Sequence, residues 1–170
     1  MQRWAVFGLS LLAACSGGGG PVVVSGGPEF LPDGGAVIST PETGPLGHQA
    51  FALVLNDVRA ENGIAVVIEN SALNAAASAH ATDMVDNNYL AHTNLDGMSP
   101  GDRAIAAGYD WDFIAENIAR GFLAESSVVQ AWMNSPGHRD TMVDPRPQEF
   151  GLGRDGSTWV LMLGRPDDTP

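Results

Sequence analysis

Three stretches decide the fold of this chain: HATDMVDNNYLAH at residues 80–92, AENIARG at residues 115–121 and WMNSPGHR at residues 132–139. The first stretch continues a stripe of apolar residues, from Leu73 to Val85, that recurs at the spacing of one helical face. We therefore expect a helix that begins at Asn70 or Ser71, either of which can cap it, and runs to about Tyr89.

Further helices are expected on both sides of these stretches. Residues 49–62 place apolar side chains at the i, i+3, i+4, i+7 positions of an amphipathic helix. Ser99-Pro100 combines a capping residue with a proline at the first helical position, and it begins a short helix that ends near Gly108. A further helix is predicted over residues 125–133, and a short helical turn opens at His138.

The end of the chain is predicted to form strands. Residues 150–153 and 158–163 are strand-like, and Asp155-Gly156 between them is a strong hairpin signal. Residues 113–119 are a candidate third strand. Because helices come first and strands late, the predicted class is α+β, with a small antiparallel sheet flanked by helices.

The N-terminus has the layout of an export signal. Residues 1–14 combine one arginine, an apolar run and two final alanines, and the run is too short to span a membrane as a helix. Leu12 to Cys15 resembles the bacterial lipobox, which implies lipidation of Cys15 and a mature chain that begins there. Ser16 then favours sorting to the outer membrane, facing the periplasm, in a host that has one. The alternative is an ordinary signal peptide with an incidental cysteine.

Glycine and proline recur every few positions after the cysteine, up to residue 47. Residues 15–47 are therefore predicted to be the lipidated cysteine and a flexible tether, with a coil's reach of roughly 30 Å. The globular domain is predicted over residues 48–166.

Composition limits the possible partners. The chain has 20 acidic residues against 8 basic ones, a formal net charge of −12, which argues against binding to nucleic acid. Its single cysteine cannot form an intramolecular disulfide, so the core alone must hold the domain together.

The three stretches, with DGMSPGDR at 96–103 and AGY at 107–109 in the same order, resemble the bacterial branch of the CAP superfamily (SCP/PR-1-like). The resemblance implies a CAP-type α-β-α sandwich with an open groove, in a secreted protein. Members of the family carry two histidines and one or two acids in that groove, and these can hold a divalent cation, often zinc.

Transferred by motif, the groove residues are His92, Glu116 and His138. The sequence departs from the family pattern in two places. Ala115 stands where glycine is usual, and Asn134-Ser135 replaces the second acid of eukaryotic members. The resemblance therefore implies a set of two histidines and one glutamate.

Two chemistries remain open for this set. Zinc on His92, Glu116 and His138 would leave a fourth position for water or substrate, as catalytic zinc sites require. Without metal, the same side chains would hydrogen-bond to one another in the groove and shift their pKa values. We expect His80 to be a core histidine bonded to a loop, and Asp102-Arg103 to hold that loop.

Three functions follow as alternatives. The first is a lipid-anchored, non-catalytic module of the cell envelope whose groove binds a lipid, a peptide or a cell-wall fragment. The second is a zinc-dependent hydrolase or protease that uses the same three residues. The third is an envelope structural protein. The lack of a complete catalytic constellation favours binding over catalysis, and the sequence leaves the oligomeric state open.

Overall fold

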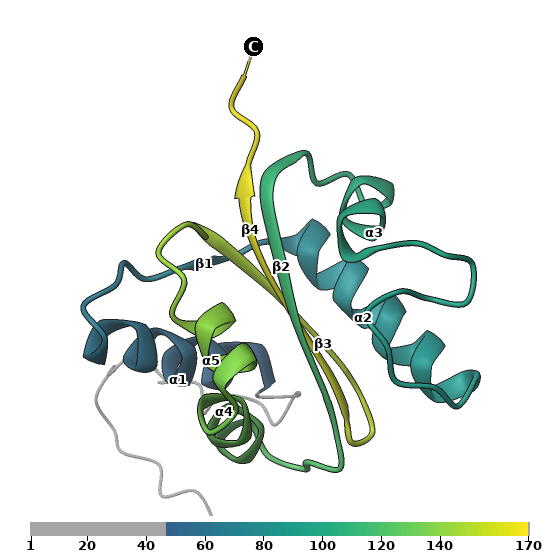
Figure 1. The fold of residues 1–170 in the computed structure, drawn as a ribbon, viewed down its shortest axis with the longest axis horizontal. Helices are drawn as coiled ribbons and strands as arrows, with labels where there is room; N and C mark the ends of the chain where they lie inside the picture. The colour runs from purple at the N-terminus through teal and green to yellow at the C-terminus, as the bar shows by residue number, and fades with distance from the viewer. Residues whose placement is uncertain (1–46, 170) are drawn as a thin grey trace, which may run out of the picture. The chain divides into compact units, whose positions relative to one another are not determined.

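The computed structural model describes residues 47–169. The predicted signal peptide, the lipidated Cys15 and the tether lie outside the described residues. The elements follow one another as α1 (Gly47–Glu61), β1 (Ile68–Glu69), α2 (Ser71–Asp86), α3 (Pro100–Ala106), β2 (Trp111–Arg120), α4 (Glu125–Met133), α5 (Pro136–Met142), β3 (Glu149–Asp155) and β4 (Thr158–Pro166) (Figure 1). No helix within the described residues has both the length and the apolar character that a membrane crossing requires.

One four-stranded sheet forms the centre of the domain, in the order β1-β3-β4-β2. The pairs β3–β4 and β2–β4 are antiparallel, as predicted, and Asp155 faces Thr158 across the hairpin turn. The short strand β1 adds a parallel pair with β3 that the sequence analysis did not predict. Strand β2 begins at Trp111, earlier than expected, and lies at one edge of the sheet.

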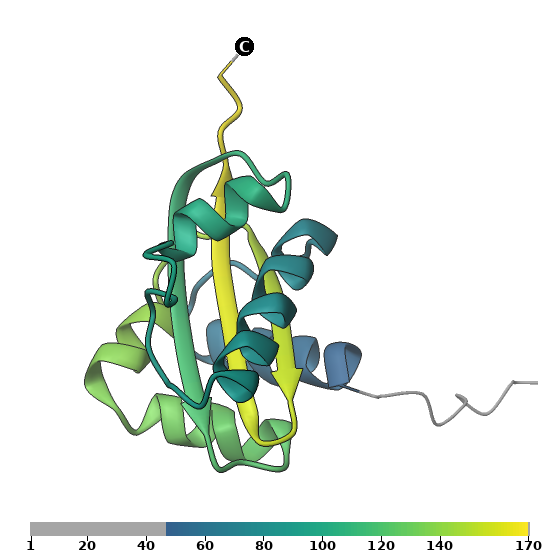
Figure 2. The same cartoon turned by 90° about the vertical axis from the view of Figure 1, so that its right-hand side faces the viewer.

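Helices cover both faces of this sheet, which gives the predicted α-β-α sandwich. Helices α2 and α3 lie on one face, and α1, α4 and α5 lie on the other (Figures 1 and 2). Along β4, Trp159 and Leu161 face the core of α1, α4 and α5, whereas Val160 and Met162 face α2. Side chains of a strand alternate between faces, so a strand buried on both sides reads as a continuous apolar run.

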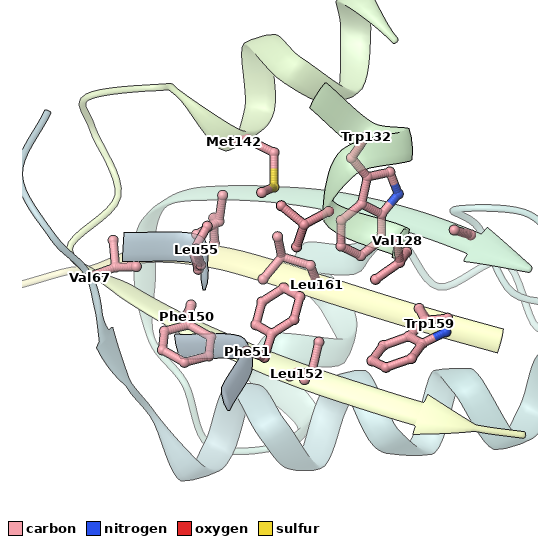
Figure 3. Close-up of a cluster of buried hydrophobic side chains, with 13 residues drawn as sticks. Phe51, Leu55, Val67, Val128, Trp132, Met142, Phe150, Leu152, Trp159 and Leu161 are labelled. Atoms are coloured by element: carbon pink, nitrogen blue, oxygen red, sulfur yellow. The ribbon is translucent and has the colours of Figure 1, made fainter. Parts of the chain in front are cut away.

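The larger core packs aromatic side chains against the sheet. Trp132 of α4 meets Phe51 of α1 edge to face, with 6.3 Å between ring centroids, and Phe51 also contacts Phe150 of β3 (Figure 3). Trp132 and Trp159 are both fully buried. Buried aromatic pairs of this kind contribute about 0.5–1.5 kcal/mol beyond the area they bury.

Glycines in β3 let α2 approach the sheet. A Cβ on Gly151 would collide with the backbone of Leu73, and a Cβ on Gly153 would collide with the backbone of Ala77. Asn70 caps α2 by accepting hydrogen bonds from the backbone of Ala72 and Leu73. The helix ends at Asp86, a few residues before the predicted end.

Candidate functional site

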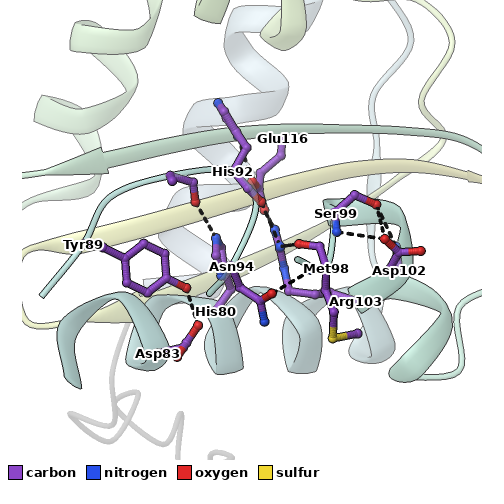
Figure 4. A network of polar contacts seen from close by, with 11 residues as sticks. His80, Asp83, Tyr89, His92, Asn94, Met98, Ser99, Asp102, Arg103 and Glu116 are labelled. Carbon is purple, nitrogen blue, oxygen red and sulfur yellow. Dashed lines mark hydrogen bonds and ion pairs between the residues drawn. The ribbon is translucent and has the colours of Figure 1, made fainter. Parts of the chain in front are cut away.

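A histidine–glutamate pair lies at the centre of the candidate site. Nδ1 of His92 donates to Oε1 of Glu116 at 2.8 Å (Figure 4). Glu116 belongs to β2 and its side chain is 1% exposed, whereas the His92 side chain, on the loop after α2, is 52% exposed. Since a carboxylate only accepts, this bond places the proton of a neutral ring on Nδ1 and leaves Nε2 as the remaining polar atom of the imidazole.

Arg103 of α3 occupies the second oxygen of the same carboxylate. Its Nη2 donates to Oε2 of Glu116 at 2.6 Å, and the arginine side chain is 8% exposed. Its Nη1 donates to the carbonyl oxygens of His92 at 2.8 Å and Met98 at 2.9 Å. The sequence analysis expected Arg103 to hold the loop, which is confirmed, but it missed the contact with Glu116.

The local sequence explains why the Arg103 side chain lies next to Glu116. Ser99 and Asp102 form a reciprocal capping box at the start of α3 (Figure 4). Pro100 holds the first helical position. The box fixes the first turn of the helix, and Arg103 follows directly on the side that faces the sheet.

The pair alters the acid–base behaviour of His92. The hydrogen bond to Glu116 raises the pKa of His92, and the negative charge of Glu116 acts in the same direction, against the opposing effects of burial and the Arg103 charge. The imidazole therefore stays protonated to a higher pH than a free histidine, and Nε2–H then faces outward as a charged donor.

His138 is connected to this region through its backbone, but its ring bonds elsewhere. Its backbone carbonyl accepts from Nδ2 of Asn117, the residue after Glu116, at 2.9 Å. Its imidazole Nδ1 lies 2.9 Å from Oγ of Ser135. The described contacts thus join His92 to Glu116 and leave the His138 ring with Ser135.

A hollow of about 380 Å³ opens beside the pair. We call it the His92 hollow; its walls include His92, Glu116, Pro100, Trp111, Ile114 and Ala115. Trp111 is held by a hydrogen bond from its indole Nε1 to the carbonyl of Gly101 at 3.1 Å. The hollow therefore combines an apolar wall with one exposed imidazole, and Trp111 is a candidate binding residue that the sequence analysis did not single out.

A divalent cation on His92, Glu116 and His138 fits this arrangement poorly. Both oxygens of Glu116 already accept from N–H donors, and the Arg103 guanidinium lies where it would repel a cation. Within residues 47–169, no group of three or more His, Cys, Asp or Glu side chains is arranged to hold a metal ion. The zinc site stays a prediction, and we derive no chemical step through it.

His80 lies in the core, as expected. It is 1% exposed, and its Nε2 lies 2.9 Å from the carbonyl of Ala91 in the loop before His92. This contact ties α2 to the loop that carries His92, so His80 helps to fix the position of the site.

Known proteins are similar to this chain in sequence. The family model described as "Cysteine-rich secretory protein family" (CAP) matches residues 53–160. An uncharacterized protein of Bacillus subtilis, YkwD, is 35% identical over 107 residues, which cover 62% of this chain and 42% of that protein. An uncharacterized membrane protein of the same organism, YlbC, is 30% identical over 59% of this chain and 29% of its own length. The chain thus spans less than half of either relative.

Solved structures share the architecture. An extracellular protein with an SCP domain from Bacillus anthracis superposes with a TM-score of 0.67 at 25% identity, over 69% of this chain and 39% of its own. An outer surface protein of Borrelia burgdorferi superposes with a TM-score of 0.65 at 21% identity, over 70% of this chain and 92% of its own. At that identity the second likeness concerns the fold alone.

Proposed function

The chain belongs to the cysteine-rich secretory protein (CAP) family, and from that membership we propose that it is a binding module of the cell envelope. A lipid on Cys15 holds the domain at a membrane, and the His92 hollow takes a lipid, a peptide or a cell-wall fragment. The relatives support a place outside the cytoplasm, because they include an extracellular protein and a membrane protein.

The single observation that carries the proposal is the His92–Glu116 pair at the mouth of an apolar hollow. A buried carboxylate orients the imidazole, and the raised pKa of His92 favours the charged form. The outward Nε2–H then suits a carboxylate or phosphate oxygen, while Trp111 and Ile114 suit an apolar group. A ligand that carries an acidic oxygen next to an apolar group matches both features.

Binding is better supported than hydrolysis. A serine nucleophile needs a histidine within hydrogen-bond reach that is itself oriented by an acid. Among the described residues, the ring of His92 bonds to Glu116, and Ser135 bonds instead to His138. Ser99, the serine in the wall of the His92 hollow, donates its hydroxyl to Asp102, so the polar groups of the hollow are arranged to hold a ligand rather than to activate a serine.

An inventory of co-purified small molecules and metals tests this function. The full chain, without a chelating resin or tag, would be analysed by mass spectrometry beside two variants. His92→Ala removes the exposed imidazole of the hollow. His48→Ala is the matched control, because His48 also pairs with a glutamate, Glu69 at 2.6 Å, away from the hollow.

We expect an acidic amphipathic compound on the wild type and the control, and its loss from His92→Ala. The same compounds in all three proteins would contradict a ligand site at His92. Stoichiometric zinc that disappears with His92→Ala would instead favour the metal-dependent hydrolase.

A further inference from the structure

We propose that the free edge of β2 binds an extended peptide, which adds a strand to the sheet and carries an acidic side chain two residues before an apolar one. The peptide is then the ligand of the His92 hollow, so this inference rests on the binding function proposed above. Within the described residues, β4 is the only strand beside β2 (Figures 1 and 2). An edge strand presents backbone N–H and C=O groups that an added strand can pair with.

Two hydrogen bonds show which residues of β2 face the free edge. Gly121, directly after β2, donates its N–H to the carbonyl of Ser157 at 3.0 Å, so it faces the β4 side. The carbonyl of Ile118 accepts instead from the indole Nε1 of Trp132 at 3.3 Å. In an antiparallel pair, successive residues face the partner strand and the opposite side in turn. Both bonds therefore place the backbone groups of Ile118 on the free edge.

The same alternation places Glu116 and Ile114 on the free edge. They lie two and four residues before Ile118, in a part of β2 whose register with β4 is regular. The Ile118 carbonyl has the Trp132 donor, but the backbone groups of Glu116 and Ile114 have no partner on this side within residues 47–169. Glu116 is 8% exposed as a whole residue and 1% exposed in its side chain, so its exposed atoms are mainly those of the main chain.

The His92 hollow opens onto this edge. Ile114, Ala115 and Glu116 all line it, although they are consecutive in one strand. Side chains of consecutive strand residues point to opposite faces of a sheet. One hollow can be lined by all three residues only where it reaches the edge of the strand. A peptide paired with β2 would therefore lie along the hollow.

The opposite edge of the sheet is partly covered. There β1 pairs with β3 at Glu149 and Phe150. Further along β3, the N–H of Leu152 donates to Oδ1 of Asn74 on α2, at 2.8 Å. Proteins commonly protect a free edge in this way against pairing with another chain. Among the described residues, the part of β2 beside the His92 hollow lacks such cover, which favours it as the edge that receives a partner.

Antiparallel pairing, the slightly more stable kind, defines the sequence of the peptide. One peptide residue exchanges both backbone hydrogen bonds with Glu116, and the residue two positions later does so with Ile114. Residues directly opposite each other point their side chains to the same face. The Glu116 side chain points to the face that holds His92 and α3.

The two peptide side chains therefore meet different groups. The side chain opposite Glu116 lies next to the outward Nε2–H of His92, which suits a carboxylate when the imidazole is charged. The side chain opposite Ile114 lies near Trp111, whose indole is bonded to α3, and this surrounding suits an apolar group. Read from its N-terminus, the peptide has the order acidic residue, any residue, apolar residue.

Two blocked pentapeptides of one composition test this order: acetyl-Thr-Glu-Thr-Val-Thr-amide and acetyl-Thr-Val-Thr-Glu-Thr-amide. Each would be titrated into the full chain by calorimetry at about pH 6, where His92 is charged. Threonine and valine favour the extended conformation in both. We expect saturable binding of the first peptide, with a dissociation constant at least about tenfold lower than that of the second, the factor that about 1.4 kcal/mol supplies.

N-methylation separates strand pairing from other modes of binding. In the first peptide, the valine N–H faces the carbonyl of Ile114, so a methyl group on that nitrogen should weaken binding at least about tenfold. The matched control carries the methyl group on the threonine between glutamate and valine. Its N–H faces away from β2, so the control should bind as the parent peptide does.

Amide NMR of the full chain locates the peptide. The N–H groups of Ile114 and Glu116 gain acceptors, so their signals should shift more than those of Ala115 and Asn117, which face β4. No saturable binding, equal binding of the two orders, equal effects of the two methyl groups, or larger shifts at another edge would each overturn the proposal. If a co-purified acidic compound still depended on His92 in that case, the binding function would stand without the peptide. Loss of both would refute the His92 hollow as a ligand site.

Discussion

Arg103 and Glu116 form a nearly buried ion pair, with 2.6 Å between Nη2 and Oε2 and side chains that are 8% and 1% exposed. Removing one partner of such a pair leaves an uncompensated charge, at a cost of about 3–5 kcal/mol. We therefore expect Arg103→Met to lower the free energy of unfolding by that amount in urea denaturation. Arg165→Met, which breaks the exposed pair with Asp112, should cost less than about 1 kcal/mol. Equal losses of unfolding free energy in the two variants would show that the buried pair contributes no more to stability than the exposed pair does.

The same pair predicts weak zinc binding. A zinc ion on Glu116 would have to displace the N–H donors of Arg103 and His92 from its two oxygens. Calorimetry of the full chain at neutral pH should therefore show no stoichiometric binding of micromolar zinc. Tight binding that is lost in His138→Ala would restore the three-residue metal site that the family resemblance implies.

The His92–Glu116 contact predicts how stability depends on pH. The folded protein raises the pKa of His92 above its ordinary value of 6.5. The stabilisation of the folded state by this contact is therefore fully present below about pH 6.5. It is lost as the pH rises through the pKa of His92 in the folded protein. Urea unfolding at about pH 5.5 and about pH 8.5, on either side of this range, should show a larger loss in His92→Ala at the lower pH. An NMR titration of His92 in Glu116→Gln should give a lower pKa than in the wild type; an unchanged pKa would contradict the assigned cause.

Because β3 and α2 pack closely, we expect that Gly153 cannot be replaced by a larger residue without a loss of stability. A Cβ on Gly153 would overlap the backbone of Ala77, which cannot move without shifting α2. Gly153→Ala should cost about 3 kcal/mol or more, at the upper end of overpacking effects. Gly137→Ala is the control, because a Cβ there meets nothing within 4 Å. Thermal unfolding of both variants measures the difference, and similar midpoints would mean that the helix can shift freely.

The lipobox-like segment predicts that Cys15 anchors the chain. Cys15→Ser should move the protein from the membrane fraction to the soluble fraction of a bacterial host, because no thiol remains to carry lipid. Ser16→Ala should stay with the membrane. The mass of the wild-type N-terminal peptide supplies the direct test: a mature N-terminus at Cys15 without lipid would contradict the anchor.

The periodic spacing of apolar residues predicted most of the fold, because each long helix or strand buries a continuous stripe of apolar side chains. The helices α1, α2 and α4 and the β3–β4 hairpin lie close to their expected residues. Strand β1 was not predicted because it has two residues, both exposed, and exists only through its pairing with β3. Helix α2 ends earlier than predicted because Asn88 adopts a positive φ, a local conformation that no apolar pattern encodes.

The sequence predicted individual residues of the site but not all of the contacts between them. Motif resemblance indicated His92 and Glu116, and the structure joins them. It could not reveal that Arg103 competes for the same carboxylate, because that contact depends on how α3 packs against β2. The ring of His138 contacts Ser135 because both lie at the start of α5, where local geometry decides the contact.

Arg103 lines a hollow of about 430 Å³ between α2 and α3, the α2–α3 hollow, and it also bonds to Glu116, which lines the His92 hollow. Thermodynamic reciprocity then applies to the two occupants. If a guest in the α2–α3 hollow shifts this guanidinium and thereby changes the affinity for a second guest beside His92, the second guest must change the affinity for the first by the same factor. A single side chain, Arg103, would then couple the binding affinities of the two hollows.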